Sequence, residues 1–222
     1  MPRAADSLAE QIARELAGRI IRNELKPRER IREQHVSQAL NVSRGAVREA
    51  LLILQRRHLI NIQSNCGAQV SELTPDHVHG LYALVVELYV LLAHTVIDYW
   101  QTDDDLQPLR DIHRRMLKSA EHGDVANFVR ESVAISYVAS AFGRNPYLQS
   151  TLDNLLPVVS RTHQLILDAR LDEMQFFNDL FTELLQSVEQ RDRARSRTLL
   201  EKYCQRNCQL VIAALAQQGA VA

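Results

Sequence analysis

The chain has 222 residues, of which 46% are hydrophobic and 24% are charged, so it can form one large domain or two modest ones with a real core. Its three cysteines are too few for a disulfide framework and are typical of a reducing compartment. Polar residues interrupt every apolar run before it reaches the length of a membrane span, and the N-terminus has no hydrophobic signal core, so the sequence predicts a cytoplasmic location and no membrane partner.

Charge is unevenly distributed along the chain. Residues 1–72 contain 12 basic and 8 acidic residues, whereas residues 73–222 contain 14 and 19. The overall charge of -1 therefore hides a basic N-terminal part and an acidic remainder. This asymmetry predicts that only the N-terminal part meets a polyanion such as DNA.

The N-terminal part begins with helical patterns. Residues 7–25 repeat apolar side chains at helical spacing, with a capping box at the start. The sequence KPRER ends this pattern, and a short helix is predicted over residues 33–40. NVS then forms a tight turn, in which Ser43 caps a further predicted helix over residues 44–57.

Two alternating segments follow, LINIQS and AQVSEL, and with NCG between them they predict a small β-hairpin. Three helices followed by a hairpin form a winged helix-turn-helix, whose second turn helix lies in the DNA major groove. Arg44 and Arg48 project from the first turns of that helix, where they can contact phosphate or pair with guanine. A solvated basic face would show the same two arginines, but the turn, the hairpin and the basic charge together favour DNA binding.

The rest of the chain is predicted to be helical. TPDH, residues 74–77, is predicted to be a linker, so the expected division is a DNA-binding domain over 1–73 and an effector-binding and dimerisation domain over 78–222. Pro157 predicts a kink or a restart. The fold class is mainly α, with an antiparallel bundle and any ligand site in its middle. The six predicted helices cover residues 76–101, 103–122, 124–142, 146–169, 172–190 and 192–218.

The segment NELKPRERIREQHVSQALNVSRGAVREALLILQRRHLINI, followed by CGAQV, resembles the GntR family of bacterial transcriptional regulators, and the helical part resembles the FadR-type (FCD) effector domain. The resemblance implies a homodimer on double-stranded operator DNA with two-fold symmetry, a small-molecule effector in the bundle, and a regulator that is usually a repressor. It carries the DNA contacts over to Arg44 and Arg48, and the helix cap to Ser43. The residues expected at the DNA interface are Arg32, Ser43, Arg44, Gly45, Arg48 and Gly67.

Three positions of the N-terminal part depart from the family's pattern. Arg28 stands where the family usually has Gly in KPGER. His58 replaces the Gly that ends the recognition helix, and a left-handed backbone there costs a histidine about 1 kcal/mol. Cys66 replaces a basic residue that is frequent in the wing, so the wing is expected to bind the minor groove more weakly. Gly67 is kept.

The C-terminal part departs further. Most FCD domains ligate a divalent metal through an Asp, a His four residues later, and two His on the last two helices. In this chain these positions fall on Ser132, Ser136, Phe181 and Tyr203. That set cannot replace imidazoles and a carboxylate, so neither a metal nor another cofactor is predicted. A relocated site at His94 and His163 is the alternative, although each is more simply explained as an imidazole with one hydrogen bond.

Loss of these ligands changes the expected effector. The first helix of the bundle has Val85 and Val86 where the family often carries an Arg for an acidic effector. The sequence therefore predicts an apolar or amphipathic effector, oriented by hydroxyl groups. The alternative is that the same side chains fill the core and that no effector binds. The expected pocket residues are Val85, Tyr89, Ser132, Ser136, Phe177, Phe181 and Tyr203.

Two further possibilities depend on reactive side chains. Cys204 and Cys208 share a helix face and can form half of a metal site or a thiol sensor, but the absence of a His–Cys pattern favours two small buried hydrophobes. An enzyme or a carrier is the other class of function. The sequence has no Gly-rich phosphate loop, no H-E-x-x-H and no nucleophile elbow, so catalysis is not expected.

Overall fold

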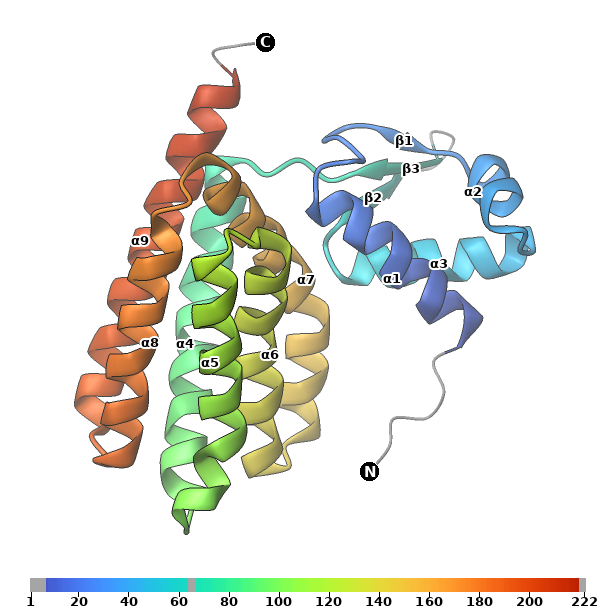
Figure 1. Ribbon diagram of the computed structural model, residues 1–222. Coiled ribbons are helices and arrows are strands. Elements are labelled where there is room, and N and C mark those ends of the chain that lie inside the picture. Colours follow the sequence, from blue (N-terminus) through green and yellow to red (C-terminus); the bar gives the residue numbers. More distant parts are fainter. Residues whose placement is uncertain (1–6, 64–66, 220–222) are drawn as a thin grey trace. The chain divides into compact units, whose positions relative to one another are not determined.

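The computed structural model describes residues 7–63 and 67–219 (Figure 1). These residues form two compact units, which are described in turn. The first unit comprises the described residues up to Leu73 together with the segment Asp153–Arg161, and the second comprises the others from Thr74 on.

The first unit is a winged helix-turn-helix. Its elements are α1 (Leu8–Ile21), β1 (Arg30–Ile31), α2 (Glu33–Leu40), α3 (Arg44–Arg56), β2 (Ile60–Gln63) and β3 (Gly67–Val70). The strands form an antiparallel sheet in the order β1-β3-β2, with Ile60 opposite Val70. α3 packs against α1, α2 and β2, and it buries Val47, Leu51 and Leu54 as its apolar stripe predicts.

Two local features differ from the prediction. α1 ends at Ile21, four residues early, because Asn23 adopts a left-handed backbone with φ of 58°. The Leu25 N–H then bonds back to the Arg19 carbonyl at 3.2 Å, which closes the end of the helix. The short strand β1 was not predicted, since two residues cannot show a period-two pattern, and its pairing with β3 is a tertiary contact.

The second unit is an all-α bundle, and the described residues contain all six predicted helices. They are α4 (Pro75–Tyr99), α5 (Gln107–Glu121), α6 (Val125–Gly143), α7 (Pro146–Ala169, whose segment Asp153–Arg161 belongs to the first unit), α8 (Glu173–Glu189) and α9 (Arg193–Gly219), with a 3₁₀ turn, η1 (Asp103–Leu106), before α5. α4 packs against α6, α8 and α9, and α5 packs against α6 and α8. In Figure 1 these five helices run alongside one another.

One prediction about a helix boundary in this part is wrong. Residues 75–77 belong to α4 and are not a linker, because Pro75 occupies the first helical turn and the Thr74 hydroxyl accepts a hydrogen bond from the His77 N–H at 3.3 Å. α7 has the predicted bounds, and of the kink or restart predicted at Pro157 the restart does not occur.

α4 is, within the described ranges, the single helix with the length and apolar composition of a membrane span. It is a core helix of the bundle, because it packs against three other helices and buries Val78, Tyr82, Val85 and Val90 among its inward side chains. Its high hydrophobicity therefore reflects contact with neighbouring helices on several sides.

Candidate functional site

The start of α3 carries four of the residues expected to contact DNA. The Ser43 hydroxyl accepts a hydrogen bond from the Ala46 N–H at 3.2 Å, which fixes the first turn. Arg44, Gly45 and Arg48 follow and are exposed. The positive end of the helix dipole and the unpaired amides of this turn favour an anion at the same place.

Arg48 is held by a carboxylate of the preceding helix. Its Nε and one terminal nitrogen donate to the two carboxylate oxygens of Glu33, at 3.2 and 2.9 Å. The pKa of Glu33 lies below its usual range, first because of this hydrogen bond and further because of the charges of Arg48 and Arg44. The Arg48 side chain remains 69% exposed, so a second partner can still reach it. Sequence reasoning missed Glu33, because the pair joins two helices and no local spacing reveals it.

The two other expected DNA contacts lie on separate segments. Arg32 directly precedes α2 with an extended backbone and is exposed. Gly67 begins β3 with φ of 76°, a conformation that L side chains rarely adopt. Cys66, where a basic residue is frequent in the family, lies outside the described residues.

Two positions where the family usually has Gly are strained in this chain. Arg28 and His58 both have left-handed backbones, with φ of 65° and 57°. His58 directly follows Arg57, the C-cap of α3, as the sequence predicts. The Arg28 side chain forms an ion pair with Glu72 at 2.7 Å. A left-handed backbone costs such residues about 1 kcal/mol relative to glycine.

The second unit contains a cavity of about 100 Å³, lined by α4, α5, α6, α8 and α9. Six of the seven expected pocket residues line it, namely Tyr89, Ser132, Ser136, Phe177, Phe181 and Tyr203. Val85 is buried but does not line it, because it lies about one turn N-terminal to Tyr89 on α4. Leu109 and Met116 of α5 also line the cavity, and sequence reasoning missed them since no pattern shows which apolar faces meet.

His163 of α7 links two polar side chains of the cavity wall. Its Nε2 lies 3.0 Å from the Tyr203 hydroxyl, and its Nδ1 lies 3.4 Å from the Ser132 hydroxyl. The Ser132 hydroxyl donates to the Val129 carbonyl at 2.9 Å. The ring of His163 is buried beside those of Phe177 and Tyr203, and burial lowers the pKa of His163 to about 4. The imidazole is therefore neutral at pH 7.

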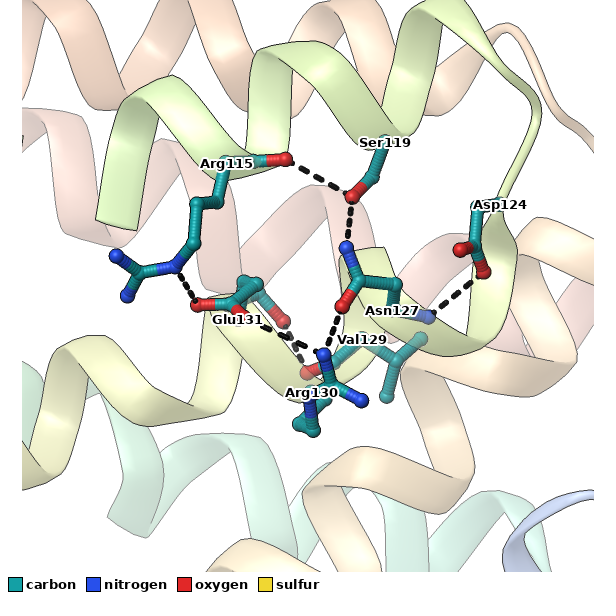
Figure 2. A network of polar contacts seen from close by, with 8 residues as sticks. Arg115, Ser119, Asp124, Asn127, Val129, Arg130 and Glu131 are labelled. Atoms are coloured by element: carbon teal, nitrogen blue, oxygen red, sulfur yellow. Dashed lines mark hydrogen bonds and ion pairs between the residues drawn. The ribbon is translucent and has the colours of Figure 1, made fainter. Parts of the chain in front are cut away.

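A network of polar contacts fixes α6, which carries Ser132, against α5 (Figure 2). Arg115 Nε donates to the buried carboxylate of Glu131 at 2.8 Å. The Asn127 amide donates to the Ser119 hydroxyl, which in turn donates to the Arg115 carbonyl at 2.9 Å. These contacts join α5 to the first two turns of α6, directly before Ser132.

The cavity wall does not fit a divalent metal. The residues at the family's metal-ligand positions all line the cavity, but they offer two hydroxyls, a phenyl ring and a phenol where imidazoles and a carboxylate are needed. The alternative ligands make other contacts: His94 Nε2 lies 3.2 Å from the Arg193 carbonyl, whereas His163 contacts Tyr203. In the part of the chain that the structure describes, no three His, Cys, Asp or Glu side chains lie together as metal ligands.

Cys204 and Cys208 are buried free thiols on α9. Burial raises the pKa of the Cys204 thiol to about 12, and it raises the pKa of Cys208 as well. The Cys208 sulfur lies 3.4 Å from Nδ1 of His79. Neither thiol is ionised at pH 7, which fits small buried hydrophobic residues better than a thiol sensor.

The winged helix-turn-helix and the helical bundle with its cavity define the class of protein: a DNA-binding transcriptional regulator with an effector domain. Residues 8–70 match the family described as bacterial regulatory proteins, gntR family, and residues 81–206 match the FCD domain. The chain therefore belongs to the GntR family of transcriptional regulators, with an FCD effector-binding domain, and proteins of this kind are not enzymes.

Two relatives come from Bacillus subtilis strain 168. The chain is 24% identical to the HTH-type transcriptional regulator YdhC over 147 residues, which is 65% of each chain. It is 28% identical to the gluconate operon transcriptional repressor over 193 residues, which is 83% of this chain and 76% of the relative. The chain thus spans somewhat less than two thirds of the first relative.

Solved structures share the fold across nearly the whole chain. McbR/YncC of E. coli superposes with a TM-score of 0.80 and 21% identity, covering 96% of this chain and 99% of that one. A transcriptional regulator from Rhodococcus sp. RHA1 gives 0.76 and 17% identity, covering 94% and 99%. At these identities the similarity establishes the fold.

Proposed function

We propose that the chain is a cytoplasmic repressor that binds operator DNA as a homodimer and changes its DNA affinity when a small molecule occupies the bundle cavity. DNA binding is assigned to residues 1–73, and effector binding and dimerisation to residues 78–222. The observation that carries the proposal is the exposed pair Arg44 and Arg48 at the capped start of α3. The gluconate operon repressor among the relatives supports the repressor role.

The proposed contacts divide between bases and phosphates. Arg48, about one turn after Arg44 on α3, is proposed to pair with a guanine edge, and Arg44 and the amide of Gly45 are proposed to meet phosphate. Arg32 and Gly67, on segments outside α3, are assigned to the DNA backbone and fix the register of the domain.

The effector is proposed to be apolar or amphipathic and to bind without a metal. Support comes from the apolar cavity wall, the hydroxyls of Ser132, Ser136 and Tyr203, and a set of donors that does not fit a metal. One observation favours the alternative of a filled core without an effector: the cavity of about 100 Å³ is smaller than most ligand pockets.

Fluorescence anisotropy with the promoter duplex beside the protein's own gene tests DNA binding. Replacing Arg48 with Ala should weaken specific binding by roughly 5- to 150-fold, because a bidentate base contact is lost. Arg56→Ala is the matched control, since Arg56 is exposed near the other end of the same helix.

The control variant should bind within about twofold of the parent, because Arg56 lies about 12 Å along the helix axis from Arg48. Equal losses in the two variants would show that only net charge matters, and an unchanged affinity in Arg48→Ala would remove Arg48 from base recognition.

A further inference from the structure

We infer that the cavity takes a small uncharged molecule with one hydrogen-bond donor on an apolar frame, of the size and chemistry of a phenol. This inference rests on the proposed function, in which the cavity is the effector site. It goes further by fixing the charge, the polar group and the size of the ligand from the side chains of this chain.

The charge follows from the lining. The side chains that line the cavity are apolar except for Tyr89, Ser132, Ser136 and Tyr203, and none of them is charged. Two imidazoles lie beside lining residues, His163 at Tyr203 and His113 at Phe181, and burial lowers the pKa of both. A carboxylate, a phosphate or an ammonium group would lose its hydration here without gaining a counter-charge, which is strongly unfavourable.

The direction of the ligand's hydrogen bond follows from a count of hydrogens. The Ser132 hydroxyl donates its one hydrogen to the Val129 carbonyl. The Ser132 oxygen is therefore the acceptor in its contact with His163, and the His163 Nδ1–H donates to it. His163 Nε2 is then an acceptor, and the Tyr203 O–H donates to it. Every hydrogen of these three groups is used within the protein. What remains on Ser132 and Tyr203 are oxygen lone pairs, so the ligand group that meets these two side chains is a donor.

The size and shape follow from the volume and the rings. A dry apolar cavity of about 150 Å³ holds one benzene ring, so a cavity of about 100 Å³ accepts a single ring or a short branched chain with a small adjustment. Four aromatic side chains line the cavity, and Phe177 meets Tyr203 edge to face with ring centroids 5.5 Å apart. Such rings favour an aromatic guest, which they can contact in the same geometry.

Three probes of similar size separate the effects of the hydrogen bond and of the charge: phenol, benzene and benzoate. The binding of each to the full chain is measured by calorimetry and thermal shift. Phenol should bind about tenfold more tightly than benzene, because it adds one buried hydrogen bond. Benzoate should give no shift at concentrations that saturate with phenol. Equal affinity for phenol and benzene, tighter binding of benzoate, or no binding of any probe would each overturn the inference.

Two variants check that the probes occupy this cavity. Tyr203→Phe removes one of the two acceptors and should lower the affinity for phenol several-fold, while the unchanged shift with benzene shows that the cavity is still formed. Ala139→Leu fills the space from α6 and should abolish both shifts. If phenol binds Ala139→Leu as it binds the parent, its site lies elsewhere and the inference is wrong.

The DNA anisotropy assay on the same preparation keeps the two proposals apart. If the chain binds its promoter duplex and the probes fail as described, the inference about the ligand fails while the regulator stands. If promoter binding is lost but phenol binds as expected, the proposed DNA contacts fail while the description of the cavity stands.

Discussion

At the scale of single residues, His58 is a site of stored backbone strain. Its φ of 57° at the end of α3 is a conformation in which glycine is not penalised. His58→Gly should therefore stabilise the first unit by about 1 kcal/mol, less a small loss from the greater freedom of glycine in the unfolded chain. Hydrogen exchange of the amides in α3 and β3 measures this local stability.

His58→Ala is the control for that prediction. Alanine removes the imidazole but keeps the Cβ that causes the strain, so exchange protection should not rise. Equal protection in the Gly and Ala variants would show that the histidine side chain, and not the backbone, limits stability at this position.

His163 makes the stability of the bundle depend on pH. Its pKa falls from 6.5 to about 4 on burial, so the folded protein holds it neutral while the unfolded chain protonates it. Stability is complete above pH 6.5 and is lost as the pH falls toward 4. Between pH 7 and pH 5 the loss should be about 2 kcal/mol. Urea unfolding, followed by the fluorescence of Trp100, measures it.

The variant His163→Gln has no titrating group at this position and should lose about 2 kcal/mol less than the parent over the same pH interval. His113, whose pKa burial also lowers, remains in both proteins, so the difference between them isolates His163. Parallel pH profiles for parent and variant would contradict the burial of a neutral imidazole.

At the scale of elements, the ion pair between α2 and α3 restrains the arginine assigned to base recognition. Glu33→Gln would release Arg48 and remove a negative charge from the face proposed to meet DNA. Affinity for random duplex should rise about 3- to 10-fold at low salt, with less discrimination between promoter and random duplex. Anisotropy titrations with the two duplexes measure both effects.

Glu49→Gln is the matched control, because Glu49 is an exposed carboxylate of α3 next to Arg48 in sequence. It changes the net charge equally but leaves the ion pair to Glu33 in place. The same gain in both variants would mean that Glu33 acts only through net charge and does not hold Arg48.

Local signals explain which elements could be predicted. The cap at Ser43 and the periodic stripe beginning at Val47 lie within a few residues of each other, so the sequence defines α3 closely. TPDH was misassigned because Pro75 is as compatible with the first turn of a helix as with a linker. The six predicted helices of the bundle were found for the same reason as α3: their caps and breaks are local.

The parts of the sites that depend on tertiary contacts could not be predicted in this way. Glu33 and Arg48 lie on different helices, and His163 reaches Tyr203 across the bundle. Val85 and Tyr89 lie one turn apart on the same face of α4, but the cavity reaches only Tyr89. The sequence did not show where along the helix the cavity ends. Periodicity identifies the buried face of a helix, but it does not show which part of that face a neighbouring helix contacts.

At the scale of the whole molecule, the two units differ in charge and in chemistry. Residues 1–72 carry the basic excess and the exposed arginines, whereas the acidic remainder carries a neutral apolar cavity. Only the first is suited to a polyanion. DNA affinity should accordingly fall steeply with salt, since each phosphate contact releases counterions.

Selection of duplexes from a random pool by the purified full chain tests the central claim most directly. We predict enrichment of a two-fold symmetric motif, with half-site centres about one helical turn, or ~34 Å, apart, and its loss when Arg44 and Arg48 are both replaced with Ala. A bound pool indistinguishable from the input, or the same motif selected by the double variant, would contradict DNA recognition by the start of α3.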